Sequence, residues 1–166
     1  VSDLGDCSLL SQLNDGSVKG WYAKAIALLP AIARVNLELE HFDPVFMARE
    51  NSIFPEWLLT NHLQLTLTFA ERQLLEQTFA RLTENNLAQP QVTMHRDFHS
   101  RNLMVLASGE LAVIDFQDMV HGPLTYDLVS LLKDCYVRWP EAVLTEGLMQ
   151  GYRCYADSGL LVGLSQ

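Results

Sequence analysis

The chain has few basic residues and few cysteines, and both shortages limit what it can bind. Its 166 residues include 11 lysines and arginines against 20 aspartates and glutamates, which gives a formal net charge of −9. Because nucleic-acid binding requires a basic surface to neutralise phosphates, this balance disfavours a nucleic-acid partner. The three cysteines, Cys7, Cys135 and Cys154, form neither a C-x-x-C metal pattern nor a set of disulfide pairs. We therefore expect a cytoplasmic protein with free, structural thiols.

Long hydrophobic runs are also missing from the sequence. The most apolar stretch, residues 23–35, is interrupted by Lys24, Pro30 and Arg34. No run reaches the roughly 20 residues that a membrane-spanning helix needs, so we expect no membrane association. Hydrophobic residues make up 49% of the chain and charged residues 19%, which is typical of a globular domain with a sizeable core.

Most of the chain shows helical periodicity. Asp43-Pro44 is a helix-start signal, and Thr68 with Glu71 forms a capping-box pattern. Pro30 is expected to kink or split the helix in which it lies, and Asn85-Asn86 is expected to stop the helix before it. We expect helices over residues 18–35, 43–59, 68–82, 126–133 and 140–155.

The pattern changes between residues 91 and 114. Residues 91–94 are β-branched at their centre, and residues 103–106 and 111–114 are apolar runs; all three segments are typical of strands, and Ser108-Gly109 is a turn between the last two. The sequence therefore predicts an α+β fold that is mainly α, in which a small β-hairpin with a loop in front of it is set into a helical body.

The loop in front of the hairpin carries a catalytic pattern. His95 to Asn102 reads H-R-D-F-H-S-R-N, which fits the H-R-D-x-x-x-x-N catalytic loop of protein kinases. A carboxylate such as Asp97 can orient an acceptor hydroxyl and take its proton. Mg²⁺ prefers oxygen ligands, and Asn102 and Asp115, at the end of the second hairpin run, offer an amide carbonyl and a carboxylate. The pattern predicts Mg²⁺-dependent phosphoryl transfer.

Other polar residues near this loop receive weaker predictions. His95 is predicted to support the loop structurally, and His99 and Arg101 face either substrate or phosphate, or belong to a solvated loop. No third ligand accompanies His95 and His99 at a useful spacing, so zinc is not expected. Asp127, near a helix start, fits a simple cap as far as the residues alone indicate.

These motifs resemble a known family. Residues 94–136, with H-R-D-F-H-S-R-N-L-M, I-D-F-Q-D and G-P-L-T-Y-D-L, are similar to the aminoglycoside phosphotransferase and choline kinase family. The resemblance implies a protein-kinase-like fold that acts on small molecules with ATP and Mg²⁺, and it assigns Asp127 to structural support of the catalytic loop. Gln117 stands where protein kinases have the glycine of D-F-G, and no A-P-E segment follows, which argues against a protein substrate.

Within this family the chain looks like the bacterial cell-wall amino-sugar kinases, which act on the anomeric hydroxyl of N-acetylmuramate and N-acetylglucosamine. The segments 2–6, 49–50 and 54–57 look like the same group. The resemblance implies that Asp3 and Leu4 contact the nucleotide from a hinge segment. The candidate acceptor-binding residues are Glu50, Glu56, Trp57, His99 and Arg101, with core packing as the alternative for Trp57.

The sequence lacks two elements that grip a nucleotide. No G-x-G occurs, and the lysines Lys19, Lys24 and Lys133 all fall in predicted helices, whereas a kinase needs a glycine-rich loop and a strand lysine. We therefore expect a hinge remnant at residues 1–6 and a kinase-like C-terminal lobe at 7–166, with the N-lobe absent. Such a chain would be inactive or nearly so, its partner would be the missing N-lobe, and its exposed lobe face would favour homo-oligomers.

Two alternative functions stay open. The same chemistry would serve an aminoglycoside, choline or homoserine, and a cationic acceptor would call for carboxylates or an aromatic cage. Alternatively, the chain is a non-catalytic binding module that retains a kinase scaffold. A substrate panel separates the first alternative from an amino-sugar kinase, and nucleotide binding to the chain separates the second.

Overall fold

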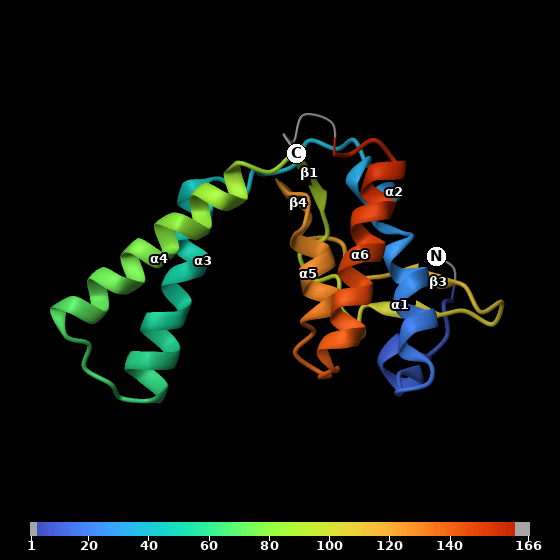
Figure 1. Ribbon diagram of the computed structural model, residues 1–166, viewed down its shortest axis with the longest axis horizontal. Helices are drawn as coiled ribbons and strands as arrows, with labels where there is room; N and C mark the ends of the chain where they lie inside the picture. Colours follow the sequence, from blue (N-terminus) through green and yellow to red (C-terminus); the bar gives the residue numbers. More distant parts are fainter. Residues whose placement is uncertain (1–2, 162–166) are drawn as a thin grey trace.

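The computed structural model of the chain describes residues 3–161 and comprises a body and a projecting helical arm (Figure 1). We call α3, η2 and α4 the arm, and the remaining elements the body. In chain order the elements are η1 (Leu9–Gln12), α1 (Val18–Ile26), α2 (Leu29–Ala33), α3 (Pro44–Ile53), η2 (Phe54–His62), α4 (Phe69–Leu87), β1 (Gln91–Met94), β2 (Leu103–Val105), β3 (Leu111–Val113), β4 (Val120–Pro123), α5 (Tyr126–Leu132) and α6 (Glu141–Asp157).

Local start signals define the helix boundaries. Pro30 lies in the first turn of α2, so the predicted helix over 18–35 is split into α1 and α2. The Asp43 carboxylate caps α3 by accepting from the Phe46 N–H at 2.8 Å. The Thr68 hydroxyl accepts from the Glu71 N–H at 3.3 Å, and Glu71 accepts from the Thr68 N–H at 2.7 Å, which completes the predicted capping box.

Two helix predictions are wrong in detail. The helix that begins at Pro44 changes to a π-helix at Phe54, because Pro55 has no N–H and its ring clashes with the carbonyl one turn earlier. Asn85-Asn86 does not stop α4, which continues to Leu87. Asparagine is only mildly unfavourable inside a helix, and the chain leaves the helix instead before Pro90.

Two short antiparallel ladders form the β structure. The expected hairpin pairs β2 with β3, with Leu103 opposite Val113. A strand that the sequence did not predict, β4, pairs with β1, with Gln91 opposite Pro123 and Met94 opposite Val120. Gly122 permits this pairing because a Cβ there would lie 2.6 Å from the Met94 sulfur.

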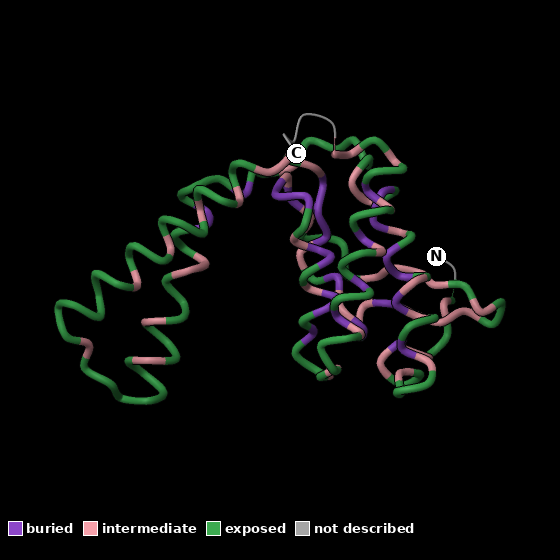
Figure 2. The backbone as a smooth tube through the Cα atoms, in the orientation of Figure 1, coloured by how far each residue is buried: buried purple, intermediate pink, exposed green. Residues whose placement is uncertain are grey.

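The core lies almost entirely in the body. Figure 2 shows buried residues along the body and largely exposed ones along the arm. The main core packs α1, α5 and α6 around the loop and β2 and includes Tyr22, Phe98, Leu103, Leu131 and Tyr155. A smaller cluster of Phe42, Phe46, Met47, Met94 and Val120 joins the base of the arm to the β1–β4 ladder.

Within residues 3–161, no helix has both the length and the apolar character needed to cross a membrane.

Candidate active site

The loop between β1 and β2 holds Asp97 and Asn102 in one tight structure. The His99 N–H donates to the Asp97 carbonyl and the Asn102 N–H to the His99 carbonyl, both at 3.0 Å. The Asn102 side-chain amide also donates to the Asp97 carbonyl at 3.1 Å. Asp97 itself is exposed at the surface of this loop, so its carboxylate is available to a ligand.

The hairpin returns Asp115 to the same place. The Ile114 N–H donates to the Asn102 carbonyl at 3.0 Å, and the Asn102 amide nitrogen lies 3.4 Å from Asp115 Oδ2. The Gln117 amide donates to Asp115 Oδ1 at 2.8 Å. The structure therefore brings the three predicted residues Asp97, Asn102 and Asp115 together at the edge of the hairpin.

The donor set of Asn102 and Asp115 fits Mg²⁺. The Asn102 amide nitrogen donates to the Asp97 carbonyl and to Asp115 Oδ2, so the amide oxygen of Asn102 is left as a possible oxygen ligand, together with the Asp115 carboxylate. Among residues 3–161, no cluster of three His, Cys, Asp or Glu side chains lies close enough to hold a metal alone.

Asp127 lies beneath the loop and contacts its backbone twice. Its carboxylate accepts from the His95 N–H at 2.7 Å and from the Arg96 N–H at 3.0 Å. Burial raises the pKa of Asp127 to about 6, although the two N–H donors favour its charged form. Arg96 adopts a positive φ of 74°, a strained conformation that this double contact helps to hold. These are the contacts that a loop-supporting carboxylate requires.

His95 links the loop to the second hairpin strand from inside the core. Its side chain is 1% exposed, and its Nε2 donates to the Ile114 carbonyl at 3.0 Å. Nδ1 is buried and has no hydrogen-bond partner within residues 3–161. Burial lowers the pKa of His95, because a charged imidazole would leave this nitrogen as an unsatisfied buried donor.

A second buried carboxylate, Asp134, also holds the loop, and sequence reasoning missed it. Asp134 accepts from the Ser100 N–H and from the Tyr136 N–H, each at 2.9 Å. The only local signal was an aspartate just after a helix, a position where Asx turns are common. Nothing in the sequence pointed to the contact with Ser100, which spans 34 positions.

The predicted acceptor-binding residues of the arm do not share one location. Glu50 lies 3.6 Å from the Arg96 guanidinium of the catalytic loop. Glu56 lines a cavity of about 800 Å³ that is formed by residues of the arm alone. Trp57 is 61% exposed, so the core-packing alternative is wrong. The structure therefore brings Glu50 to the loop and places Glu56 in a separate cavity.

The chain directly after the predicted hinge segment pairs with the hairpin. The Asp3 carboxylate accepts from the Gly5 N–H at 2.9 Å, and Leu4 is partly buried. Next along the chain, the Val105 N–H donates to the Cys7 carbonyl at 2.7 Å. Residues 1 and 2 of the predicted hinge lie outside the described residues.

Comparisons with known proteins support the family that the sequence motifs indicated. The profile of the "Phosphotransferase enzyme family" matches residues 3–161. An N-acetylmuramate/N-acetylglucosamine kinase of Neisseria meningitidis serogroup B is 38% identical over 168 residues, which covers 98% of this chain and 50% of that protein. A protein of the same name from Pseudomonas putida is 38% identical over 154 residues, covering 92% and 45%. The chain spans about half the length of the curated relatives it matches.

Solved structures show the same fold at low identity. An aminoglycoside-3'-phosphotransferase of type VIII superposes with a TM-score of 0.63 at 12% identity, over 93% of this chain and 60% of that one. The choline kinase LicA from Streptococcus pneumoniae superposes with a TM-score of 0.51 at 15% identity, again over 93% and 60%. These neighbours confirm the mainly helical, protein-kinase-like fold that the sequence predicted.

Proposed function

The chain belongs to the phosphotransferase enzyme family, and from this premise we propose that it is the catalytic lobe of a cytoplasmic small-molecule kinase. The proposed reaction transfers the γ-phosphoryl group of ATP to a hydroxyl of an amino sugar, either N-acetylmuramate or N-acetylglucosamine. The substrate class is supported by the names of the two curated relatives and by the motif resemblance. The observation that carries the chemistry is the meeting of Asp97, Asn102 and Asp115 at one edge of the hairpin.

Asp97 is the residue that we assign to proton transfer. Its exposed carboxylate accepts the proton of the acceptor hydroxyl as the hydroxyl oxygen forms a bond to the γ-phosphorus. The bond between that phosphorus and its oxygen to the β-phosphate breaks, and ADP leaves with the electron pair. The loop geometry supports this role, because the two turns from Asp97 to Asn102 fix the backbone on which the carboxylate is carried.

Asn102 and Asp115 are the residues that would hold Mg²⁺. When bound, the ion gathers and neutralises the negative charge of the triphosphate. The hydrogen bond from Gln117 fixes one oxygen of the Asp115 carboxylate and so limits its rotation. A carboxylate that is already oriented loses less entropy when it acquires a ligand.

We also propose that upstream residues of a longer parent protein bind the phosphates of the nucleotide. The relatives are about twice the length of the matching region, and the sequence has neither a G-x-G nor a strand lysine of the kind that kinases use. Asp3 and Leu4 would then lie at the junction between the two parts. Assembly into homo-oligomers stays a prediction, which light scattering over a dilution series tests.

The first test is ATP turnover by the chain extended with the residues that precede it in its parent, across a panel of amino sugars, aminoglycosides, choline and homoserine. We expect turnover of an amino sugar, and a loss of at least about 100-fold in Asp97→Asn, because that change removes the proton acceptor. The chain alone should show little or no turnover.

Three outcomes would contradict the proposal. Turnover of choline or an aminoglycoside, but of no amino sugar, would overturn the substrate class. Unchanged turnover in Asp97→Asn would overturn the role of that residue. If the folded chain with its upstream residues binds Mg-ATP and turns over no acceptor, a binding module becomes the better interpretation.

A further inference from the structure

Two side chains of the catalytic loop converge on a tyrosine that lies outside it. The His99 ring packs edge-on against the Tyr136 ring, with 5.2 Å between the ring centroids. The Arg101 guanidinium carbon lies 5.0 Å from the centroid of the same ring. We call His99, Arg101 and Tyr136 the tyrosine platform. Ser100, between the two loop residues, is fully buried. The loop is therefore anchored at its centre, and His99 and Arg101 on either side of Ser100 contact Tyr136.

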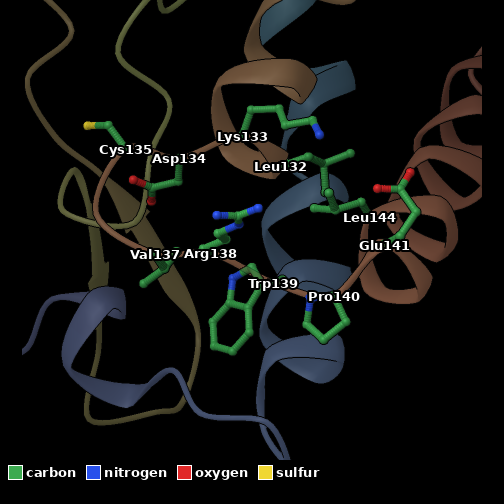
Figure 3. A pocket seen from close by; sticks show the side chains of 10 residues that line it. All are labelled: Leu132, Lys133, Asp134, Cys135, Val137, Arg138, Trp139, Pro140, Glu141 and Leu144. Carbon is green, nitrogen blue, oxygen red and sulfur yellow. The ribbon is translucent and has the colours of Figure 1, made fainter.

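Asp134 fixes the platform to the catalytic loop. It lies on the segment that joins α5 to α6, at the edge of a cavity of about 740 Å³ (Figure 3). One oxygen of its buried carboxylate accepts from the Ser100 N–H and the other from the Tyr136 N–H. Since one side chain holds both backbones, the loop and the tyrosine cannot move apart without exposing a buried carboxylate, which would be costly.

Arg101 is a cation without an acidic partner in the described part of the chain. The ion pairs among residues 3–161 join Lys19 to Glu146 and Arg96 to Glu50. The Arg101 guanidinium makes no hydrogen bond in this range, and the residue is exposed. Its donors are therefore free for a ligand. It also directly precedes Asn102 in the sequence, so this free cation belongs to the same loop as the catalytic residues.

We propose that Arg101, held on Tyr136, binds a carboxylate of the acceptor and makes the site prefer N-acetylmuramate over N-acetylglucosamine. This inference rests on the proposed function. The two sugars differ by the lactyl ether of N-acetylmuramate, which carries a carboxylate. A guanidinium binds a carboxylate through two parallel hydrogen bonds. In a chain with a net charge of −9, an anionic acceptor needs a local cation to offset the repulsion.

Tyr136 makes this cation more effective. An exposed arginine loses rotamer freedom when it binds a ligand, whereas a guanidinium that already lies on an aromatic ring has lost part of that freedom in the free protein. Asp134 and Tyr136 are therefore positioning residues, and Arg101 is the residue that contacts the acceptor.

The experiment compares the two sugars on the full chain by titration calorimetry. We expect the chain to bind N-acetylmuramate at least about tenfold more tightly than N-acetylglucosamine, a typical effect of a charged hydrogen bond. Arg101→Gln should reduce this ratio to about one, by weakening the binding of N-acetylmuramate more than that of N-acetylglucosamine. Arg101→Lys should retain part of the ratio, because the charge remains while the paired donors are lost. Arg138→Gln removes an equal charge from an exposed position and should preserve the ratio.

Each other outcome counts against the inference. Equal affinities in the unmodified chain, or a ratio that Arg101→Gln leaves unchanged, overturn the inference but not the proposed function. An equal loss for both sugars in Arg101→Gln also overturns it, since that result indicates a general role in the loop or with phosphate. If neither sugar binds the chain and neither is phosphorylated by the extended protein, both the inference and the proposed function are overturned. Thermal unfolding of each variant checks that it is folded.

Discussion

At the scale of single residues, the loop between β1 and β2 is held by buried acidic side chains as well as by its own turns. Asp127 takes the N–H groups of His95 and Arg96, and Asp134 takes that of Ser100. These backbone N–H groups of the loop therefore have buried hydrogen-bond acceptors, while Asp97 stays exposed. Catalysis benefits from such an arrangement, because groups that are fixed before the substrate arrives need no reorganisation during the reaction.

The buried His95 predicts how stability depends on pH. Burial lowers its pKa in the folded chain, so below the ordinary histidine pKa of about 6.5 the unfolded chain binds more protons than the folded one. The contribution of His95 to stability should therefore fall as the pH is lowered from about 7 to about 5, whereas Asp127, whose pKa burial raises to about 6, acts in the opposite direction. His95→Gln, whose amide can still donate to the Ile114 carbonyl, should lose less over that range. Urea denaturation at several pH values measures both slopes, and parallel slopes would contradict the prediction.

The residues of the site differ in how far the sequence revealed them. Asp97, Asn102 and Asp115 stand out because phosphoryl transfer demands particular residue types at a spacing that a short loop and hairpin can bring together. Asp134 gives no such signal, because its role depends on a contact with Ser100 across the fold. Glu56 was predicted from resemblance alone, and the structure places it in a cavity of the arm.

At the scale of elements, the packing of α5 on α6 depends on two glycines. A Cβ at Gly147 would lie 2.5 Å from a Leu132 methyl carbon, and one at Gly151 would lie 2.4 Å from a Leu128 methyl carbon. The missing side chains let α6 approach α5 closely. This contact matters for the site, because Asp127 is carried by α5 and Asp134 follows directly after it.

Alanine substitutions test this packing. Gly151→Ala should destabilise the chain by about 1–3 kcal/mol, because the added methyl group overfills the contact with Leu128. Gly20→Ala is the matched control: it lies in α1 with no atom within 4 Å of its added Cβ. That change should stabilise the chain by roughly 0.5–1 kcal/mol, since alanine favours a helix. Denaturation midpoints measure both, and the same sign for the two variants would refute the argument.

Element prediction succeeds where the signal is local. The capping box at Thr68 and the split at Pro30 are encoded within a few residues, and both are confirmed. β4 was missed because Gly122-Pro123 resembles a break, and it becomes a strand only through its pairing with β1. The π-helix was missed because a proline after an uninterrupted helical pattern gives no indication of which irregularity it will cause.

At the scale of the whole molecule, the body and the arm differ in how they are stabilised. η2 and α4 contain no buried residue, and in α3 only Phe46 and Met47 are buried. Large apolar side chains such as Leu74 and Phe69 are 64% and 76% exposed. With so little apolar area removed from water, the arm gains much less hydrophobic stabilisation than the body (Figure 2).

The arm should therefore open before the body unfolds. In native-state hydrogen exchange, the amides of α4 should exchange through openings of lower free energy than those of α1 and α6. Thr68→Ala, which removes the cap of α4, should lower protection in the arm by about 1 kcal/mol and leave the body unchanged. Protection of α4 equal to that of α6 would show that the chain unfolds as one unit.

The two ends of the arm leave the body side by side. The Thr93 hydroxyl donates to the Val35 carbonyl at 2.7 Å, so the chain departs and returns at almost the same point although 58 positions separate the two residues. A segment inserted in this way can diverge in length and sequence while the flanking segments keep their positions. The arm could then change in evolution without disturbing the positions of Asp97, Asn102 and Asp115.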